Sequence, residues 1–137
     1  MIGIVFLGNR RVELLDFADP VPGPRDVILE IKASGMCGTD LRAYRRDHAG
    51  EEPSIAGHEP CGVVAEVGAG VSEREAKVGK RVMVHHYDGC GVCRHCRSGW
   101  TQLCEEGSVS YGSGKGHGGH APYMKVPAHT LIPLPEP

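Results

Sequence analysis

The stretch Gly35-Met36-Cys37-Gly38-Thr39-Asp40, with Gly57-His58-Glu59-Pro60 further along, is the part of the sequence around which the chain is organised. It offers a thiolate at Cys37, an imidazole at His58 and a carboxylate at Glu59, which are the ligand types that Zn²⁺ takes in catalytic sites. Adjacent side chains of a straight strand point to opposite sides, so His58 and Glu59 can share an ion only at a bend, which the flanking glycine and proline allow. The alternative is a buried cysteine, a surface histidine and a solvated glutamate that never meet.

A second group of candidate ligands is the run Cys90-x-x-Cys93-x-x-Cys96, followed by Cys104. Four thiolates complete a tetrahedral site, so this spacing predicts a closed, structural zinc site in a lobe over residues 88–106. A disulfide scaffold is the alternative, but these four cysteines are too closely spaced to cross-link distant elements.

Other side chains of this lobe have simpler interpretations. We expect Arg94, Arg97 and backbone N–H groups to offset the negative charge of the four sulfurs. Trp100 is expected to cover one side of the cluster. His95 is not expected to bind the metal, because the cysteines already satisfy it.

The composition limits the classes of function. The chain has 137 residues, enough for one domain with an ordinary core. Its 15 basic and 17 acidic residues nearly cancel, which gives no support to binding of nucleic acid or of a membrane surface. The sequence lacks an apolar run of membrane-spanning length and the features of a signal peptide, so we expect a cytoplasmic protein.

The hydrophobic pattern predicts a mainly β domain. Twenty glycines and ten prolines indicate short elements and many turns. A hairpin turn is expected at Gly8-Asn9, and a short helix is expected over residues 40–46 with Thr39 as its N-cap. Apolar or alternating runs predict strands over residues 2–7, 11–17, 27–31, 61–67, 79–85, 121–126 and 130–134.

The two cysteine-containing motifs together resemble the N-terminal, GroES-like catalytic domain of the zinc-dependent medium-chain alcohol dehydrogenases, over nearly the whole chain. The resemblance implies a partly open β-barrel with short helices and a projecting four-cysteine zinc lobe. It implies one catalytic zinc on Cys37 and His58, with Glu59 as a ligand in some members, and one structural zinc in the lobe. The lobe favours the alcohol/polyol dehydrogenase branch over the zinc-free quinone reductases.

The resemblance also implies an activity. The chain would be the zinc- and substrate-binding half of an NAD(P)-dependent alcohol or polyol dehydrogenase, in which a zinc-bound alkoxide transfers hydride to NAD or NADP. Thr39 matches the family hydroxyl that accepts the substrate's proton. Many relatives continue the proton relay with a histidine at the position of Arg42, but arginine does not release its proton. We therefore expect Arg42 to bind a cofactor phosphate, and His48, or ribose hydroxyls with water, to complete the relay.

The expected organisation is a single GroES-like domain over residues 1–137. No G-x-G-x-x-G motif follows a strand and opens a helix, so the NAD(P)-binding Rossmann domain is expected to be absent and the chain alone to be inactive. A small alcohol or polyol is the expected substrate, with no nucleic acid or membrane partner, and the full enzyme is expected to be a homo-oligomer, either a dimer or a tetramer.

Two other functions are weighed against this one. A non-catalytic, zinc-stabilised binding or assembly module would have the same fold, but it has no use for an open metal site. A zinc-free reductase would lack the pair Cys37 and His58.

The remaining candidate residues have structural alternatives. Asp40 is expected to be a first-turn carboxylate or a partner of a ligand, and Cys61 a small buried apolar residue. His85, His86 and Tyr87 either line the substrate cleft, as in relatives, or simply end a strand.

Overall fold

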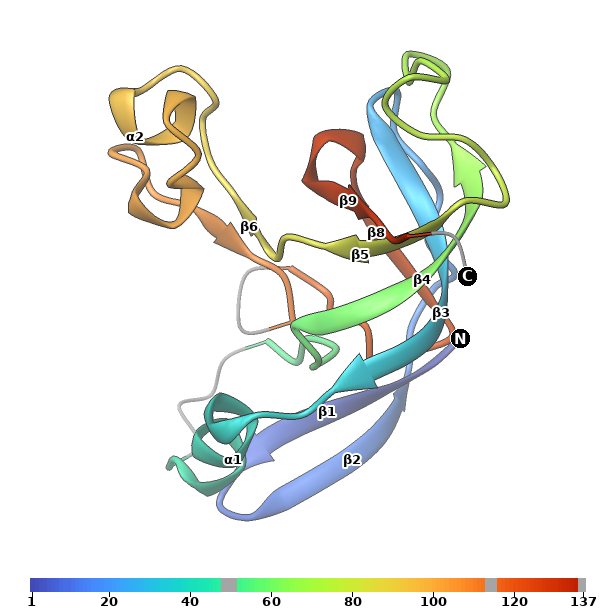
Figure 1. Ribbon diagram of the computed structural model, residues 1–137. Helices are drawn as coiled ribbons and strands as arrows, with labels where there is room; N and C mark the ends of the chain where they lie inside the picture. Colours follow the sequence, from blue (N-terminus) through green and yellow to red (C-terminus); the bar gives the residue numbers. More distant parts are fainter. Residues whose placement is uncertain (48–51, 113–115, 136–137) are drawn as a thin grey trace.

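The structure is a computed structural model that describes residues 1–47, 52–112 and 116–135. Figure 1 shows a curved sheet, a hairpin below it, and a small lobe that projects to one side. In chain order the elements are β1 (Ile2–Gly8), β2 (Arg11–Asp16), β3 (Asp26–Gly35), α1 (Gly38–Arg45), β4 (Glu59–Val67), β5 (Arg81–Val84), β6 (Tyr87–Asp88), α2 (Arg94–Arg97), η1 (Thr101–Leu103), β7 (Val109–Ser110), β8 (Tyr123–Pro127), η2 (Ala128–Thr130) and β9 (Leu131–Pro133).

The main sheet has five antiparallel strands in the order β8-β3-β4-β5-β9. Side chains of a strand alternate between its two faces, so every second residue of these strands is directed to the core. The burial of these apolar side chains is the main favourable contribution to folding. The buried core cluster consists of Val27, Leu29, Val64, Ala76, Val82, Val84, Met124, Val126 and Ala128.

The hairpin β1–β2 forms its own two-stranded sheet and is attached to the main body through a connecting segment. The N–H of Ile4 donates to the carbonyl of His120 at 3.0 Å, and the N–H of Ala56 donates to the carbonyl of Ile4 at 2.9 Å. The described strands therefore do not pair into a closed ring. The domain is mainly β, with 39% strand and 14% helix, which confirms the predicted fold class.

The sequence predicted seven of the strands in the described residues, with differences at their ends, but not the two-residue strands β6 and β7. Strand β4 begins at Glu59, two residues earlier than expected, and β8 begins at Tyr123 rather than at residue 121. The hairpin turn is centred on Asn9 and Arg10, whose φ angles are both positive, and not on Gly8-Asn9.

The N-cap assignment of α1 was wrong. The helix begins at Gly38, and its N-cap is Cys37 rather than Thr39. The N–H of Thr39 donates to the sulfur of Cys37 at 3.4 Å. Cysteine is a rare cap, so the usual preference for a hydroxyl side chain favoured the wrong residue.

The lobe extends from the end of β5 and contains the one-turn helix α2 and the 3₁₀ turn η1 (Figure 1). Two side-chain contacts tie it to the barrel. Thr101 Oγ1 lies 2.8 Å from His85 Nε2, and Asp88 Oδ1 lies 2.8 Å from His129 Nε2. Among the helices of the described residues, none is long and apolar enough to cross a membrane.

Candidate active site and metal centres

Cys37, His58 and Glu59 meet where β3 ends and β4 begins, at one end of two neighbouring inner strands of the main sheet. The sulfur of Cys37 lies 3.2 Å from Nε2 of His58. One ligand atom from each of the three residues lies within 4.8 Å of the others. The two motifs that the sequence analysis joined on chemical grounds are therefore also joined in space.

The pairing of β3 with β4 brings these residues together. In the antiparallel register, Gly35 at the end of β3 lies opposite Glu59 at the start of β4. Cys37 follows β3 by two residues, and His58 precedes β4 by one. Both residues therefore lie at the same end of this strand pair. A Cβ at position 35 would collide with the carboxylate of Glu59, so the absence of a side chain at Gly35 leaves room for it.

The N-terminus of α1 positions Cys37. The backbone N–H of Cys37 donates to Asp40 Oδ2 at 2.8 Å, so the first turn of the helix closes back on its cap. The sulfur lies at the positive end of the helix dipole, which stabilises an anionic ligand there. The backbone of this turn thus fixes the position of the cysteine sulfur.

Asp40 also lies against His58. Its Oδ1 is 3.6 Å from His58 Nδ1, and the two residues are only 3% and 7% exposed. His58 Nδ1 is buried, and the described residues contain no hydrogen-bond partner for it. With Nε2 directed to the sulfur, the proton of a neutral ring belongs on Nδ1, facing the carboxylate. A carboxylate behind a metal-binding imidazole fixes its tautomer and orientation, so the site fits a divalent metal.

The hydroxyl of Thr39 completes the cluster. Its Oγ1 lies 3.0 Å from the Cys37 sulfur and 3.0 Å from His58 Nε2. Its position in the first turn of α1, two residues after the cap, directs it toward both candidate ligands. This arrangement places a hydroxyl group next to the candidate metal position.

His86 packs against this cluster, and His85 does not. The ring of His86 lies 5.2 Å from that of His58, centroid to centroid. Burial, and then the charges of His58 and His85, lower the pKa of His86 below its ordinary value, so the ring favours its neutral form. His85 instead contacts Thr101 of the lobe. The sequence could not separate these neighbours, because both follow the same strand.

Gly57 is held in a conformation that places His58. Its φ angle is +95°, and a Cβ there would lie 2.5 Å from Nδ1 of His120. The N–H of Gly119 donates to the carbonyl of Gly57 at 2.8 Å. The sequence did not predict this packing against residues 118–120, because no local pattern indicates a contact between residues so far apart in the chain.

The four cysteines of the lobe form the second candidate metal centre. One sulfur from each of Cys90, Cys93, Cys96 and Cys104 lies within 4.8 Å of the others. Backbone N–H groups donate to three of them: that of Cys90 to Cys104 at 3.3 Å, of Cys93 to Cys90 at 3.4 Å, and of Cys96 to Cys93 at 3.5 Å. Such N–H groups would offset the negative charge of sulfurs that bind a metal ion.

The thiols of the lobe differ in acidity. Hydrogen bonds from the backbone of Cys96 and of Glu105 lower the pKa of Cys93 to about 6. Burial raises the pKa of Cys96. Since the thiolate is the metal ligand, Cys93 is available to a metal at neutral pH without an external base.

Two other side chains of the lobe were singled out in the sequence. Arg94 is paired with Glu105, its Nε lying 2.9 Å from the carboxylate. Trp100 is 57% exposed. Their expected roles, offsetting the charge of the sulfurs and covering one side of the cluster, stay predictions.

The other candidate residues are not among the candidate ligands of either cluster. Arg42 is exposed on α1 and has no ion pair with another described residue. Cys61 is half-buried in β4 and is a free thiol. Asp40 is a buried first-turn carboxylate, as predicted. His48 lies outside the residues that the structure describes.

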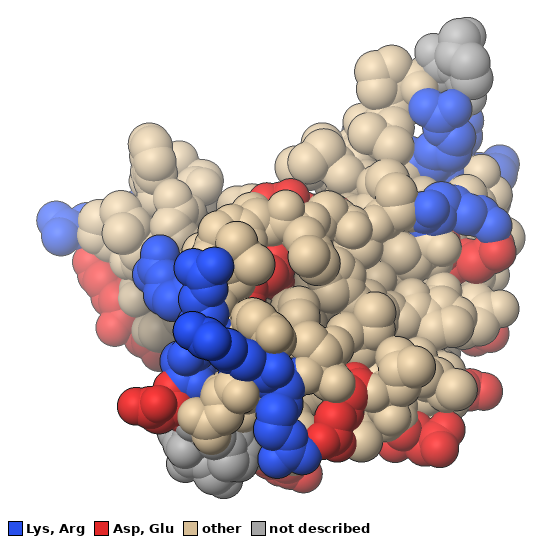
Figure 2. Space-filling model, turned by 90° about the horizontal axis from the view of Figure 1, so that it is seen from below, with Lys and Arg blue, Asp and Glu red and all other residues tan. Residues whose placement is uncertain are grey.

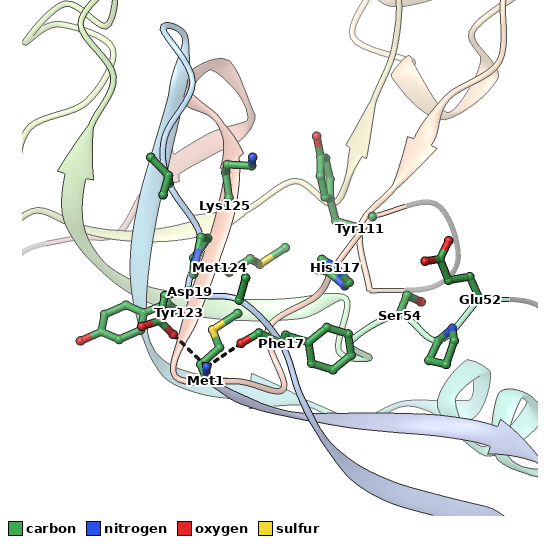
Figure 3. A pocket seen from close by; sticks show the side chains of 15 residues that line it. Met1, Phe17, Asp19, Glu52, Ser54, Tyr111, His117, Tyr123, Met124 and Lys125 are labelled. Carbon is green, nitrogen blue, oxygen red and sulfur yellow. Dashed lines mark hydrogen bonds and ion pairs between the residues drawn. The ribbon is translucent and has the colours of Figure 1, made fainter.

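A separate pocket of about 780 Å³ lies between β8 and the segment that follows β2 (Figure 3). Phe17 and His117 meet there edge to face, with ring centroids 5.0 Å apart. His117 Nδ1 accepts a hydrogen bond from the N–H of Ile55 at 3.2 Å, which gives this histidine a structural role. None of the candidate metal ligands lines this pocket.

Residues 23–136 match the family model of the alcohol dehydrogenase GroES-like domain. The chain belongs to this family. It is 38% identical, over 99% of its length, to an uncharacterised zinc-type alcohol dehydrogenase-like protein of Escherichia coli. It is also 38% identical, over 85% of its length, to an L-threonine 3-dehydrogenase of Mesorhizobium japonicum. The chain spans 40% and 35% of these two relatives.

Solved structures of the family have the same fold. A thermostable alcohol dehydrogenase from Pyrobaculum aerophilum matches with a TM-score of 0.86 and 33% identity, over 100% of this chain and 41% of that one. Galactitol-1-phosphate dehydrogenase from Escherichia coli matches with a TM-score of 0.85 and 28% identity, over 98% of this chain and 38% of that one. The relatives are oxidoreductases of the zinc-type alcohol dehydrogenase family.

We predict that Gly57→Ala destabilises the domain more than Gly79→Ala. Gly79 has a similar φ of +86°, but a methyl group added there would meet nothing within 4 Å, so it reports the backbone cost alone, about 1–2 kcal/mol. Gly57→Ala adds the collision with His120. Urea unfolding of both zinc-saturated variants measures the difference, and equal costs would contradict a tight contact at position 57.

We predict that Cys104→Ser removes one zinc ion and loosens residues 88–106 while the barrel stays folded. A four-thiolate site supplies folding free energy locally, and most of the barrel core lies outside the lobe. Elemental analysis gives the zinc content, and amide hydrogen exchange shows which segments lose protection. Unchanged zinc content would contradict the assignment of this site.

Proposed function

We propose that this chain is the zinc- and substrate-binding part of an NAD(P)-dependent alcohol or polyol dehydrogenase. The observation that carries the proposal is the cluster of Cys37, His58 and Glu59, with the Thr39 hydroxyl 3.0 Å from two of their ligand atoms. Family membership supports the reaction class. The chain covers about two-fifths of its relatives, so the nicotinamide cofactor would bind to another part of a longer protein. Its cytoplasmic location and homo-oligomeric state remain predictions.

The two metal centres would have different tasks. Cys37, His58 and Glu59 would hold a catalytic zinc, because three ligands leave one coordination position for a substrate oxygen. The four cysteines of the lobe would hold a structural zinc, because they leave none. When bound at the first site, Zn²⁺ lowers the pKa of a hydroxyl group that it contacts.

The chain's own residues would orient this site and move the proton. The carboxylate of Asp40 lies 3.6 Å from Nδ1 of His58, on the side of the ring away from the sulfur of Cys37, and would orient the imidazole when a metal binds. The hydroxyl of Thr39 accepts the proton that the substrate hydroxyl loses and donates its own outward. Arg42 would bind a phosphate of the cofactor, since a guanidinium offers paired donors to phosphate oxygens.

The runner-up, a non-catalytic module, would keep the lobe but would not need the open cluster. Thr39, Asp40 and His58 are more than such a module requires, because a buried carboxylate–imidazole pair costs desolvation energy that a scaffold would avoid. The burial of this pair favours the enzyme.

We predict that Cys37→Ala and His58→Ala each remove one of two zinc ions and leave the lobe zinc in place. Each substitution takes one ligand from a site that has only three, and neither touches the four-cysteine centre. Cys61→Ala is the matched control, because it removes a nearby free thiol that is in neither cluster, and it should retain both ions. Two retained zinc ions in Cys37→Ala, measured by elemental analysis, would rule out the proposed catalytic site.

We predict that Thr39→Ala lowers turnover by about a hundredfold or more in an enzyme completed by a nicotinamide-binding domain, as loss of a positioned proton-transfer group does. Thr39→Ser keeps the hydroxyl and should retain most of the activity. Both variants should keep their zinc. Steady-state rates with an alcohol substrate test this, and equal rates for the alanine and serine variants would contradict the role of the hydroxyl.

A further inference from the structure

Five arginines gather on one surface, where the C-terminal half of α1 meets the β1–β2 turn. Figure 2 shows Lys and Arg side chains concentrated there, at the lower left. All five side chains are exposed. The chain as a whole has a net charge of −2, so this concentration of positive charge is a local feature. The arginine surface consists of Arg10, Arg11, Arg42, Arg45 and Arg46.

A strained turn joins the two halves of the arginine surface. The N–H of Asn9 donates to the carbonyl of Arg46 at 2.7 Å, and the N–H of Arg10 donates to that of Tyr44 at 2.8 Å. Asn9 and Arg10 have φ angles of 49° and 60°. Two-residue hairpin turns with both φ values positive favour Asn-Gly, so an arginine at the second position is disfavoured by its Cβ. The turn therefore contains a charged residue at a position where glycine would have the lower conformational energy.

Two of the five arginines of this surface, Arg11 and Arg46, interact with other residues of the chain. Arg11 pairs with Glu13. Within the described ranges, Arg10, Arg42 and Arg45 have no ion pair with a carboxylate. The helix dipole favours arginines in the last turn of α1, which would explain Arg42 and Arg45 as a solvated helix end. The helix dipole does not explain Arg10, because this residue belongs to the β1–β2 turn. That turn places Arg10 beside α1 although the positive φ of an arginine carries a conformational cost.

The surface starts close to the candidate catalytic site. Arg42 follows Cys37 by five residues, and Arg45 by eight, on the same helix. A rise of 1.5 Å per residue places them about 7 and 12 Å from Cys37 along the helix axis. A ligand of ordinary metabolite size could therefore lie with one end at the metal centre and an anionic group on the arginines.

We propose that the arginine surface binds the phosphate ester group of a ligand whose other end lies at the Cys37–His58–Glu59 centre. Guanidinium groups bind phosphate through paired N–H donors, and several around one group match its three or more acceptor oxygens. The phosphate can belong to a phosphorylated polyol substrate or to a dinucleotide cofactor. The position of the ligand relative to the metal rests on the proposed function, whereas phosphate binding by the arginines does not.

The test is titration calorimetry on the zinc-loaded chain at low ionic strength, with inorganic pyrophosphate as the first probe. Arg42→Ala, Arg45→Ala and Arg10→Gly should each weaken binding by about three- to tenfold, the effect of removing one charge-assisted contact. Arg10→Gly should also leave the thermal midpoint unchanged or raise it, because glycine accepts a positive φ. That variant separates loss of binding from loss of folding.

Arg74→Ala is the matched control, because Arg74 is exposed in the loop between β4 and β5 and its loss changes the net charge equally. It should bind pyrophosphate as the unaltered chain does. Equal weakening by Arg74→Ala, or unchanged binding in all three test variants, would overturn the proposal, since attraction would then be diffuse.

Two further arms identify the source of the phosphate. Glycerol 1-phosphate is compared with glycerol, and NADP⁺ and NAD⁺ are compared with nicotinamide riboside. Arginine-dependent binding in the first arm assigns the phosphate to the substrate, and in the second to the cofactor; binding in neither arm overturns the proposal. If Cys37→Ala keeps both zinc ions while pyrophosphate binding still depends on the arginines, the proposed catalytic site fails and the phosphate site stands.

Discussion

The antiparallel pairing of Gly35 with Glu59 is the constraint on which the candidate catalytic site depends. This pairing places the end of β3 beside the start of β4. As a result, the sulfur of Cys37 and Nε2 of His58 lie 3.2 Å apart although the two residues are distant in the chain. The buried core residues of β3 and β4 hold this register, because a slip of one residue would turn their apolar side chains to solvent. The energy of the core thus sets the geometry of the site, and Gly35 provides the space in which the carboxylate of Glu59 can lie.

The two candidate metal centres depend on the fold in different ways. The cysteines of the lobe are close together in sequence, and backbone N–H groups of the same loop donate to their sulfurs. This centre needs the barrel only for anchorage, through the contacts His85–Thr101 and His129–Asp88. In the open centre the N–H of Thr39 donates to the sulfur of Cys37, but the other two ligands are distant in sequence. They are the first residue of β4 and the residue before it, and the buried carboxylate of Asp40 lies against His58 from helix α1.

The helix α1 connects chemistry at one end with charge at the other. Its first turn provides Cys37, Thr39 and Asp40, whose positions follow from the geometry of a capped helix. Its last turn provides arginines, beside which the strained β1–β2 turn places Arg10. A short helix with cationic side chains in its last turn has favourable charges at its negative end. The same helix places the candidate metal position and the arginine surface along one axis.

The sequence by itself determined the β class, all strands except the short β6 and β7, the grouping of the four cysteines and the side chains of the open cluster. These follow from local periodicity and from spacing, which do not depend on distant contacts. It did not determine that Cys37 caps α1, that His86 rather than His85 packs against His58, or that Gly57 lies on His120. The association of Arg10 with α1 was equally hidden. Most of these are contacts between segments far apart in the chain, and only the burial of a common core, with its strand register, brings such segments to a defined distance.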